Sequence, residues 1–304
     1  MKIALLSNGN INYSTLRLKY EAEKKGHKVK IIKYKNCYVA IDRKQGVMYK
    51  GKPIKDYDAM IPRIANSMTN YGTSIVRQLE LQGIYTTSSS LSIVRARDKL
   101  RSAQILARHG VPIPKTVFSR NTTDIDDLID AVGGCPVIIK LARGTHGNGV
   151  VLAETKKTAV SALQALYLMN KDGTNLLIQE FIEETAGTDI RAFVVGNEVV
   201  ASYQRRSLND DFRANMHRGA EGSPINLTIK EKRIAIKAAK AMGLEIAGVD
   251  LMRSKKGPMV IEVNASPGFL AEKITGVNIA EKIIEHIENN AGKNIKKDKI
   301  GQWV

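Results

Sequence analysis

Cysteine and aromatic residues are both scarce in this chain of 304 residues. Its two cysteines, Cys37 and Cys135, lack metal-ligand spacing and do not suggest the disulfide framework of a small secreted protein. Aromatic residues make up 5% of the chain, and no cluster of Phe, Tyr and Lys resembles a platform for stacking bases. A dedicated RNA-binding module is therefore the weaker interpretation.

Long apolar runs and two common nucleotide-binding motifs are also absent. The apolar run at residues 1–6 is too short for a signal peptide or a membrane span, so we expect a cytoplasmic protein that does not contact membranes. The turn at residues 7–10 lacks the G-x-G-x-x-G pattern of dinucleotide-binding folds. No Gly-Lys-Ser or Gly-Lys-Thr precedes a helix, which excludes a Walker loop.

Positive charge is in clear excess. The chain carries 47 Lys and Arg against 30 Asp and Glu, which gives a net charge of +17. Such a balance favours anionic partners, among them nucleotides, acidic peptides, nucleic acid and ribonucleoprotein surfaces, without choosing between them. The length and the 43% hydrophobic content allow a multi-lobed enzyme.

Alternating strand and helix patterns predict an α/β fold with three lobes and a basic tail. The predicted boundaries are 1–90, 91–175, 176–290 and 291–304. In the first lobe we expect strands at 2–6, 29–34 and 58–61 and helices at 14–25 and 72–82. Later in the chain we expect strands at 115–118, 136–141 and 150–153, and helices at 92–109, 124–132, 158–169 and 229–242.

Two segments have the composition of a nucleotide site. The strand that ends at Lys140 runs into a glycine-rich turn at residues 144–149, where backbone N–H groups could approach phosphate oxygens and Lys140 could add positive charge. A flexible hairpin with a solvated lysine is the alternative. The apolar strand at residues 177–182 offers aliphatic walls and one polar pair, Gln179 and Glu180, which suits adenine but also suits an ordinary buried strand.

Three oxygen-bearing side chains mark the most informative segment, residues 248–264. Its pattern predicts a β-hairpin with a turn near Lys256, so that Asp250 pairs with Glu262 and Asn264 lies on the same face as Glu262. A hard cation such as Mg²⁺ prefers oxygen ligands of this kind. The alternative is a hairpin with a solvated acidic face.

Arginines lie between these segments, at Arg191, Arg205 and Arg213. On strands that share a sheet with the hairpin, they could bind a γ-phosphate or a carboxylate bidentately. Surface salt bridges would explain some of them equally well.

Order and spacing of these motifs resemble those of the ATP-grasp superfamily. Within it, residues 95–102, 211–219 and 247–250 are similar to the RimK-type ligases, which add glutamates to the C-terminus of a small-subunit ribosomal protein, and the similarity runs to about residue 288. The resemblance implies an ATP-grasp fold, in which two α+β lobes clasp ATP, preceded by a Rossmann-like pre-ATP-grasp domain. It also implies L-glutamate as substrate, an acidic protein C-terminus as acceptor, an acylphosphate intermediate and a homo-oligomer such as a tetramer.

The resemblance assigns roles to individual residues. ATP would be held by Lys99, Lys140, Gly147, Gln179, Glu180, Phe181, Ile182, Asp189, Arg213 and Asn215. Two Mg²⁺ or Mn²⁺ ions would be bound by Asp250, Glu262 and Asn264. Arg191, Arg205 and Arg213 would act in catalysis, and Arg63, Arg205, His217, Arg218 and Ser266 would line the substrate side.

One segment departs from the family pattern: residues 269–276 are less acidic than usual and one residue shorter. Because they border the substrate side, two other functions stay open. The first is a ligase that adds an amino acid to a small molecule or a carrier protein. The second is a non-catalytic ribosome- or RNA-binding protein that retains the fold.

Overall fold

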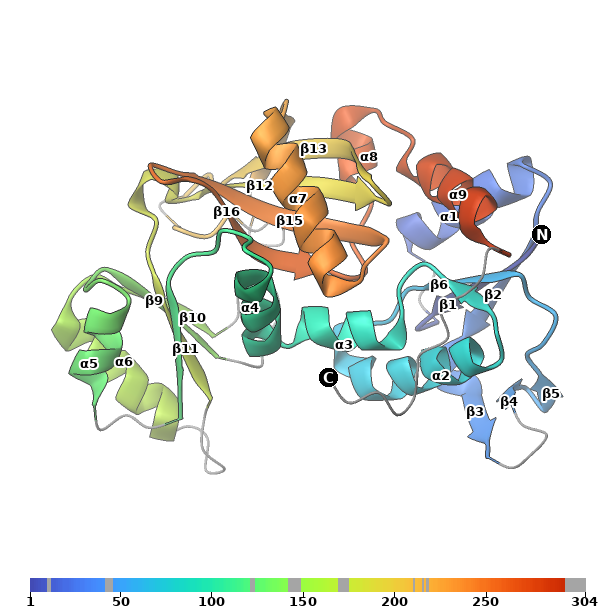
Figure 1. Cartoon of the computed structure of the whole chain (residues 1–304), viewed down its shortest axis with the longest axis horizontal. Coiled ribbons are helices and arrows are strands. Elements are labelled where there is room, and N and C mark those ends of the chain that lie inside the picture. Colours follow the sequence, from blue (N-terminus) through green and yellow to red (C-terminus); the bar gives the residue numbers. More distant parts are fainter. Residues whose placement is uncertain are drawn as a thin grey trace.

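In the part of the chain that it describes, the computed structural model contains three larger sheets and one small sheet, arranged along the length of the molecule (Figure 1). An N-terminal sheet lies at one end and a four-stranded antiparallel sheet at the other, with a five-stranded sheet between them. Within the part of the chain that is described, no helix is both long and apolar enough to cross a membrane. The structure describes residues 1–9, 12–41, 46–120, 124–141, 149–168, 175–209, 211–214, 216 and 219–292.

Four parallel strands in the order β2-β1-β6-β7 form the N-terminal sheet. The predicted βαβ unit is confirmed, and α1 begins where the side chain of Asn12 accepts a hydrogen bond from the backbone N–H of Thr15. The helix predicted at 72–82 begins three residues earlier. The elements are β1 (Lys2–Ser7), α1 (Tyr13–Lys24), β2 (Lys28–Lys33), β6 (Ala59–Pro62), α2 (Thr69–Leu81) and β7 (Tyr85–Thr86).

A small antiparallel sheet, which the sequence did not predict, lies between β2 and β6 in the chain. It is made of short strands: β3 (Cys37–Ala40), β4 (Gly46–Tyr49) and β5 (Lys52–Pro53). Two 3₁₀ turns, η1 (Tyr34–Asn36) and η2 (Asn66–Met68), occur in the same lobe.

The single helix predicted at 92–109 is wrong, because the chain forms two helices there, α3 (Ser90–Arg97) and α4 (Lys99–Arg108). Asp98 separates them. Its backbone is extended, with φ −93° and ψ 107°, and its carboxylate accepts a hydrogen bond of 2.9 Å from the backbone N–H of Arg101. An aspartate in this position caps a new helix, so α4 starts in a new direction with Lys99 in its first turn.

The second sheet is antiparallel, in the order β10-β9-β11-β8, and α5 and α6 are packed with it around their own apolar core (Figure 1). Strand β11, which we expected to open the third lobe, pairs with β8 and β9 and so lies in this sheet. The elements are β8 (Thr116–Ser119), α5 (Ile125–Ala131), β9 (Val137–Leu141), β10 (Val150–Ala153), α6 (Lys156–Leu168) and β11 (Leu176–Glu180).

The third sheet has five antiparallel strands in the order β14-β13-β12-β15-β16. Helix α7 packs on one face, and α8 and α9 pack on the other (Figure 1). The elements are η3 (Glu183–Thr185), β12 (Thr188–Val195), β13 (Glu198–Arg206), β14 (Glu221–Pro224), α7 (Ile229–Met242), β15 (Ile246–Ser254), β16 (Gly257–Asn264), α8 (Leu270–Thr275) and α9 (Ile279–Asn290).

Helix α7 has the predicted bounds because both of its ends are specified locally. Thr228 and Glu231 form a capping box at the start, and Gly243 in the left-handed region ends the helix. The basic tail lies outside the described residues from residue 293 onward.

Candidate active site

The predicted hairpin is formed by β15 and β16. Its register places Asp250 opposite Glu262 and Gly248 opposite Asn264, as the sequence predicted. A bulge between Asp250 and Leu251 leaves Ile261 without a partner in the ladder. Val249, Leu251 and Val263 are buried in the core on the α7 side, so Asp250 and Glu262 lie on the opposite face of the sheet.

Asp250 is buried and held by two arginines, Arg191 on the adjacent strand β12 and Arg205 on β13, the strand beyond it. Arg191 contacts both of its carboxylate oxygens, at 2.6 Å from Nε and 2.5 Å from Nη2. Arg205 reaches the same carboxylate at 2.9 Å and forms a second bidentate pair with Asp189, at 2.5 and 2.6 Å. Two carboxylates and two guanidinium groups therefore form one buried network across β13, β12 and β15.

The network exists because of cross-strand register. Arg191 lies opposite Asp250, and Asp189 lies opposite Arg205. Residues 189 and 191 lie on the same face of β12 because side chains alternate along a strand. The sequence predicted all four residues as site residues, but not that they would pair with one another.

Burial and ion pairing oppose each other in this network. Burial raises the pKa of Asp189 to about 6, although Arg205 counteracts that shift. Burial would also raise the pKa of Asp250, but Arg191 and Arg205 outweigh it and hold that pKa below its ordinary value. Asp250 is therefore ionised at neutral pH, and the two arginines neutralise it.

The three predicted metal ligands fit a hard cation in their chemistry, since all of them offer oxygen. Glu262 is exposed, Asn264 is half-buried, and the oxygens of Asp250 face arginines in this structure. Within the described ranges, no group of three or more His, Cys, Asp and Glu side chains comes together. A metal at this hairpin would bind Glu262 and Asn264 and would share Asp250 with the arginines.

Two lysines from other parts of the chain face Glu262. Lys140, at the end of β9, donates a hydrogen bond of 2.6 Å to Gln179, and Lys99, in α4, donates one of 2.8 Å to the carbonyl oxygen of Leu141. Burial lowers the pKa of Lys140 to about 8 and also lowers the pKa of Lys99, while the Glu262 carboxylate opposes both shifts. The structure thus brings three predicted residues from three elements together.

The predicted adenine segment lies at the end of β11. Glu180 is occupied by structural contacts, since its carboxylate accepts hydrogen bonds from the backbone N–H of Lys115 at 3.0 Å and from Lys256 at 3.2 Å. Ile182 is buried, and the Phe181 ring meets Phe212 edge to face. These apolar groups can form a wall for a flat ring, with backbone groups supplying the polar edge.

Arg213 joins the third lobe to strand β10 of the second lobe. It pairs with Asp211 at 2.8 Å, contacts the carbonyl oxygen of Val150 in β10 at 3.4 Å, and lies over the Phe212 ring. The predicted residues that lie outside the described part of the chain are Gly147, Asn215, His217 and Arg218.

Arg63 lies where the N-terminal sheet meets the segment after β16. Its guanidinium donates to the carbonyl oxygen of Pro267 at 2.8 Å and to the Ser14 hydroxyl at 2.9 Å, and it lies over the Phe269 ring. Its Nε is buried without a hydrogen-bond partner, and burial lowers the pKa of the side chain to about 10. Ser266 approaches the carbonyl oxygen of Pro62 at 3.5 Å in the same region.

Sequence reasoning missed Ser14 and Phe269 as neighbours of Arg63. Phe269 opens the segment that departs from the family pattern, and that departure was a usable signal. Ser14 gave none, because it lies in the first turn of α1 and reaches Arg63 only through the pairing of β1 with β6.

Comparison with known proteins shows matches to two family models that together cover most of the chain. Residues 1–93 match the family described as the RimK PreATP-grasp domain, and residues 96–287 match the RimK-like ATP-grasp domain. A protein of Coxiella burnetii (strain RSA 493 / Nine Mile phase I) named probable alpha-L-glutamate ligase is 54% identical over 96% of each chain. One of the same name from Picosynechococcus sp. is 50% identical over 99% of each chain.

Solved structures share the fold at low identity. The ATP-grasp ligase PsnB, complexed with minimal precursor, Mg and ADP, superimposes with a TM-score of 0.72 at 17% identity, covering 95% of this chain and 96% of PsnB. A RimK domain protein ATP-grasp from Sphaerobacter thermophilus DSM 20745 gives a TM-score of 0.70 at 18% identity, covering 94% and 99%. The predicted ATP-grasp fold is confirmed, and the chain belongs to the family of RimK-like ATP-grasp ligases.

Proposed function

We propose that this ATP-dependent acid–amino-acid ligase adds L-glutamate residues to the C-terminus of a small-subunit ribosomal protein. The names of relatives that are about half identical over almost their full length support glutamate as the added amino acid. The net charge of +17 supports an acidic acceptor, because opposite charge accelerates and orients encounter.

The observation that carries the proposal is that Lys99 and Lys140 are close enough to Glu262 for its charge to raise their pKa values, while Glu262 pairs across the hairpin with Asp250. Positive groups from α4 and β9 face an oxygen ligand on β16, which is the arrangement that a nucleotide triphosphate and its cation require. We assign ATP to Lys99, Lys140, Gly147, the segment from Gln179 to Ile182, Asp189, Arg213 and Asn215. The cations, two Mg²⁺ or Mn²⁺, are assigned to Asp250, Glu262 and Asn264.

The proposed reaction has two steps. An oxygen of the acceptor carboxylate attacks the γ-phosphorus of ATP, and the bond from that phosphorus to the β-phosphate oxygen breaks. The products are ADP and an acylphosphate on the acceptor. The amine of glutamate then attacks the acyl carbon, inorganic phosphate leaves, and the amine loses a proton. A bound divalent cation would neutralise phosphate charge and align its oxygens.

The chain's own cations have distinct tasks in this scheme. We assign Lys99 and Lys140 to the phosphate oxygens, and Arg213, which contacts Val150 in β10, to the same side of the nucleotide. We assign Arg191 and Arg205 to the carboxylate and the transferred phosphoryl group, because guanidinium groups bind such oxygens bidentately once they are released from Asp250. Arg63 and Ser266 lie on the acceptor side, to which we also assign His217 and Arg218.

The test combines the purified protein with ATP, Mg²⁺, L-glutamate and cell extract. We expect ADP release and a ladder of masses, spaced by one glutamyl residue, on one ribosomal protein. A ladder on a small metabolite would contradict the proposed acceptor and leave glutamate ligation intact. RNA affinity that falls with salt, without ATP consumption, would instead support a binding protein. We further propose a cytoplasmic homo-oligomer such as a tetramer, which light scattering can check.

A further inference from the structure

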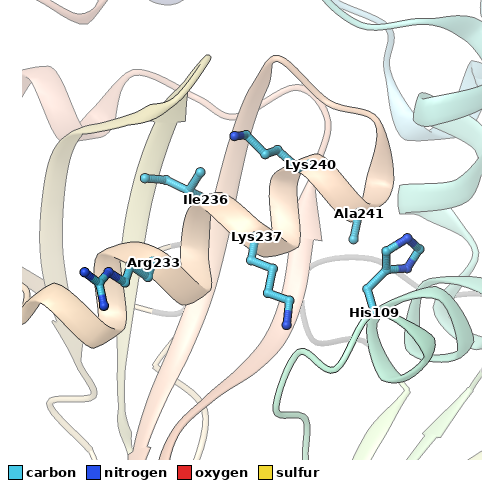
Figure 2. Close-up of a pocket in the computed structure, with 6 residues that line it drawn as sticks. All are labelled: His109, Arg233, Ile236, Lys237, Lys240 and Ala241. Atoms are coloured by element: carbon cyan, nitrogen blue, oxygen red, sulfur yellow. The ribbon is translucent and has the colours of Figure 1, made fainter.

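A hollow of about 430 Å³ lies between α7 and the end of α4. Figure 2 shows that α7 contributes all but one of its lining residues and that His109 faces them from the end of α4. The Asp250 network lies on the other face of the sheet from α7, so the hollow is separate from the candidate active site. The lining residues are His109, Arg233, Ile236, Lys237, Lys240 and Ala241.

The surface around this hollow carries positive charge without exposed acidic side chains on either helix. Helix α4 contains no acidic residue, and the one acid of α7, Glu231, is buried and paired with Arg253. Among the described residues, no ion pair involves the cations of the exposed α7 face. That face, which we call the basic face, consists of Lys230, Lys232, Arg233, Lys237 and Lys240.

Helix electrostatics explain only part of the basic face. Lys237 donates a hydrogen bond of 3.0 Å to the carbonyl oxygen of Gly110 just past α4, and Lys240 lies in the last turn of α7, where the helix dipole favours cations. Lys230 and Lys232 lie in the first turn, where the dipole favours acids instead. Their presence there is unfavourable for the isolated helix, so a partner of negative charge is the better explanation.

The apolar part of the lining narrows the choice of partner. Ile236 and Ala241 are half-buried, and Figure 2 shows Lys237 and Lys240 between them along α7. No Phe, Tyr or Trp side chain lines the hollow, and its one ring, the His109 imidazole, is tied to the carbonyl oxygen of Ile105 at 2.8 Å, so the hollow offers no platform for stacking successive bases. A volume of this size accommodates a side chain of a docked segment, whereas a phosphate backbone needs surface charge alone.

We propose that the basic face and its hollow bind an acidic polypeptide segment, with carboxylates on the cations and one apolar side chain on Ile236. That this segment belongs to the acceptor protein rests on the proposed function. The binding itself does not. Docking on the outer side of the sheet would hold the acceptor while its C-terminus enters the candidate active site.

The experiment measures binding of a fluorescent peptide to the full chain without ATP. The peptide consists of glutamates around a central leucine, and its C-terminus is amidated so that it lacks the carboxylate that ligation would use. The test variant carries Arg233→Gln, Lys237→Gln and Lys240→Gln. The control variant removes the same charge from exposed lysines elsewhere that form no ion pair in the described structure, through Lys52→Gln, Lys55→Gln and Lys157→Gln.

We expect the test variant to bind the peptide about tenfold more weakly, since three exposed charge pairs are lost, and the control variant to bind within about twofold of the parent protein. Replacing the central leucine of the peptide by serine should weaken its binding to the parent protein. The same replacement should not weaken binding to a protein variant that carries Ile236→Ser. ADP formation should be unchanged in the test variant, and its unfolding temperature should fall by no more than a few degrees, because Lys237 and Lys240 each make only one weak contact at an exposed position.

Equal peptide affinity of the test and control variants would overturn the proposal. So would an RNA oligonucleotide of equal charge that binds at the basic face while the peptide does not. If the parent protein binds the peptide at the basic face but does not ligate glutamate to any ribosomal protein, only the proposed function is contradicted.

Discussion

At the scale of single residues, the Asp250 carboxylate shows how the site balances its charge. Arg191 and Arg205 together neutralise Asp250 and Asp189, so the buried network is neutral as a whole. A divalent cation on Asp250 would compete with guanidinium groups for the same oxygens. Arg191 and Arg205, once released from Asp250, would then be free to bind phosphate or carboxylate oxygens. Their contacts with the substrate would therefore depend on metal binding.

Glu262→Gln tests the metal assignment directly. The amide keeps the size of the side chain but removes the charge that faces Lys99 and Lys140, so we expect ADP formation to fall on the order of a thousandfold. The measurement is coupled-enzyme detection of ADP at saturating Mg²⁺. Glu221→Gln, an exposed residue on β14 of the same sheet, is the matched control and should keep its activity. Unchanged turnover in Glu262→Gln would refute the site.

The lowered pKa of Lys140 predicts how the affinity for ATP depends on pH. Its pKa in the folded protein is about 8, and only the charged ammonium attracts phosphate. Affinity should therefore be complete below about pH 8 and fall above it, by up to about tenfold per pH unit. Calorimetric titration with ATP between about pH 7 and 9.5 measures this fall. Lys140→Met should bind ATP more weakly at pH 7 and show a shallower decline, whereas parallel curves would contradict the assignment.

At the scale of elements, Asp98 sets the start of α4 and hence the position of Lys99. Asp98→Ala removes the hydrogen bond to the backbone N–H of Arg101 and should lower the free energy of unfolding by about 1 kcal/mol. Urea denaturation measures the difference. Asp98→Asn keeps an accepting oxygen and should remain within a few tenths of a kcal/mol of the parent protein. If Asn destabilises as much as Ala, the side chain does not act as a cap.

The elements that the sequence predicted are those with local signals at their own ends. Thr228 and Gly243 delimit α7, and the turn near Lys256 fixes the pairing of Asp250 with Glu262. The break at Asp98 was missed because no glycine or proline marks it, and residue 98 can equally sit inside a basic helix. Strands β3, β4 and β5 were missed because each is only two to four residues long, too short for an apolar alternation to be read from the sequence.

The charge pairs of the site could not be predicted for a different reason. Arg191 and Asp250 are 59 positions apart, and their contact depends on the order β13-β12-β15 within the sheet. Residue spacing fixes which face a side chain occupies along its own strand, but it does not fix which strands become neighbours. The sequence and the family pattern therefore predicted which residues belong to the site, but they did not predict how those residues pair with one another.

At the scale of the whole molecule, Arg63 connects the N-terminal lobe to the end of the hairpin formed by β15 and β16. It reaches Ser14 in α1 and Pro267 after β16, and among the described residues no carboxylate pairs with it. A buried guanidinium without a counter-ion is costly, and the carboxylate of a bound substrate would supply the missing charge and a partner for Nε. The joint between the lobes would then also be a substrate site.

Arg63→Met separates these two roles. Methionine preserves much of the apolar stem against Phe269 and removes a charge that burial disfavours, so thermal unfolding should change little. If Arg63 binds a substrate carboxylate, KM for glutamate or for the acceptor should rise about tenfold or more while the affinity for ADP stays the same. If Arg63 only joins the lobes, the variant should unfold at lower temperature and lose ADP affinity and KM together. Steady-state kinetics with each substrate varied in turn, alongside ADP titration and thermal unfolding, distinguish the outcomes, because only a substrate role changes one KM alone.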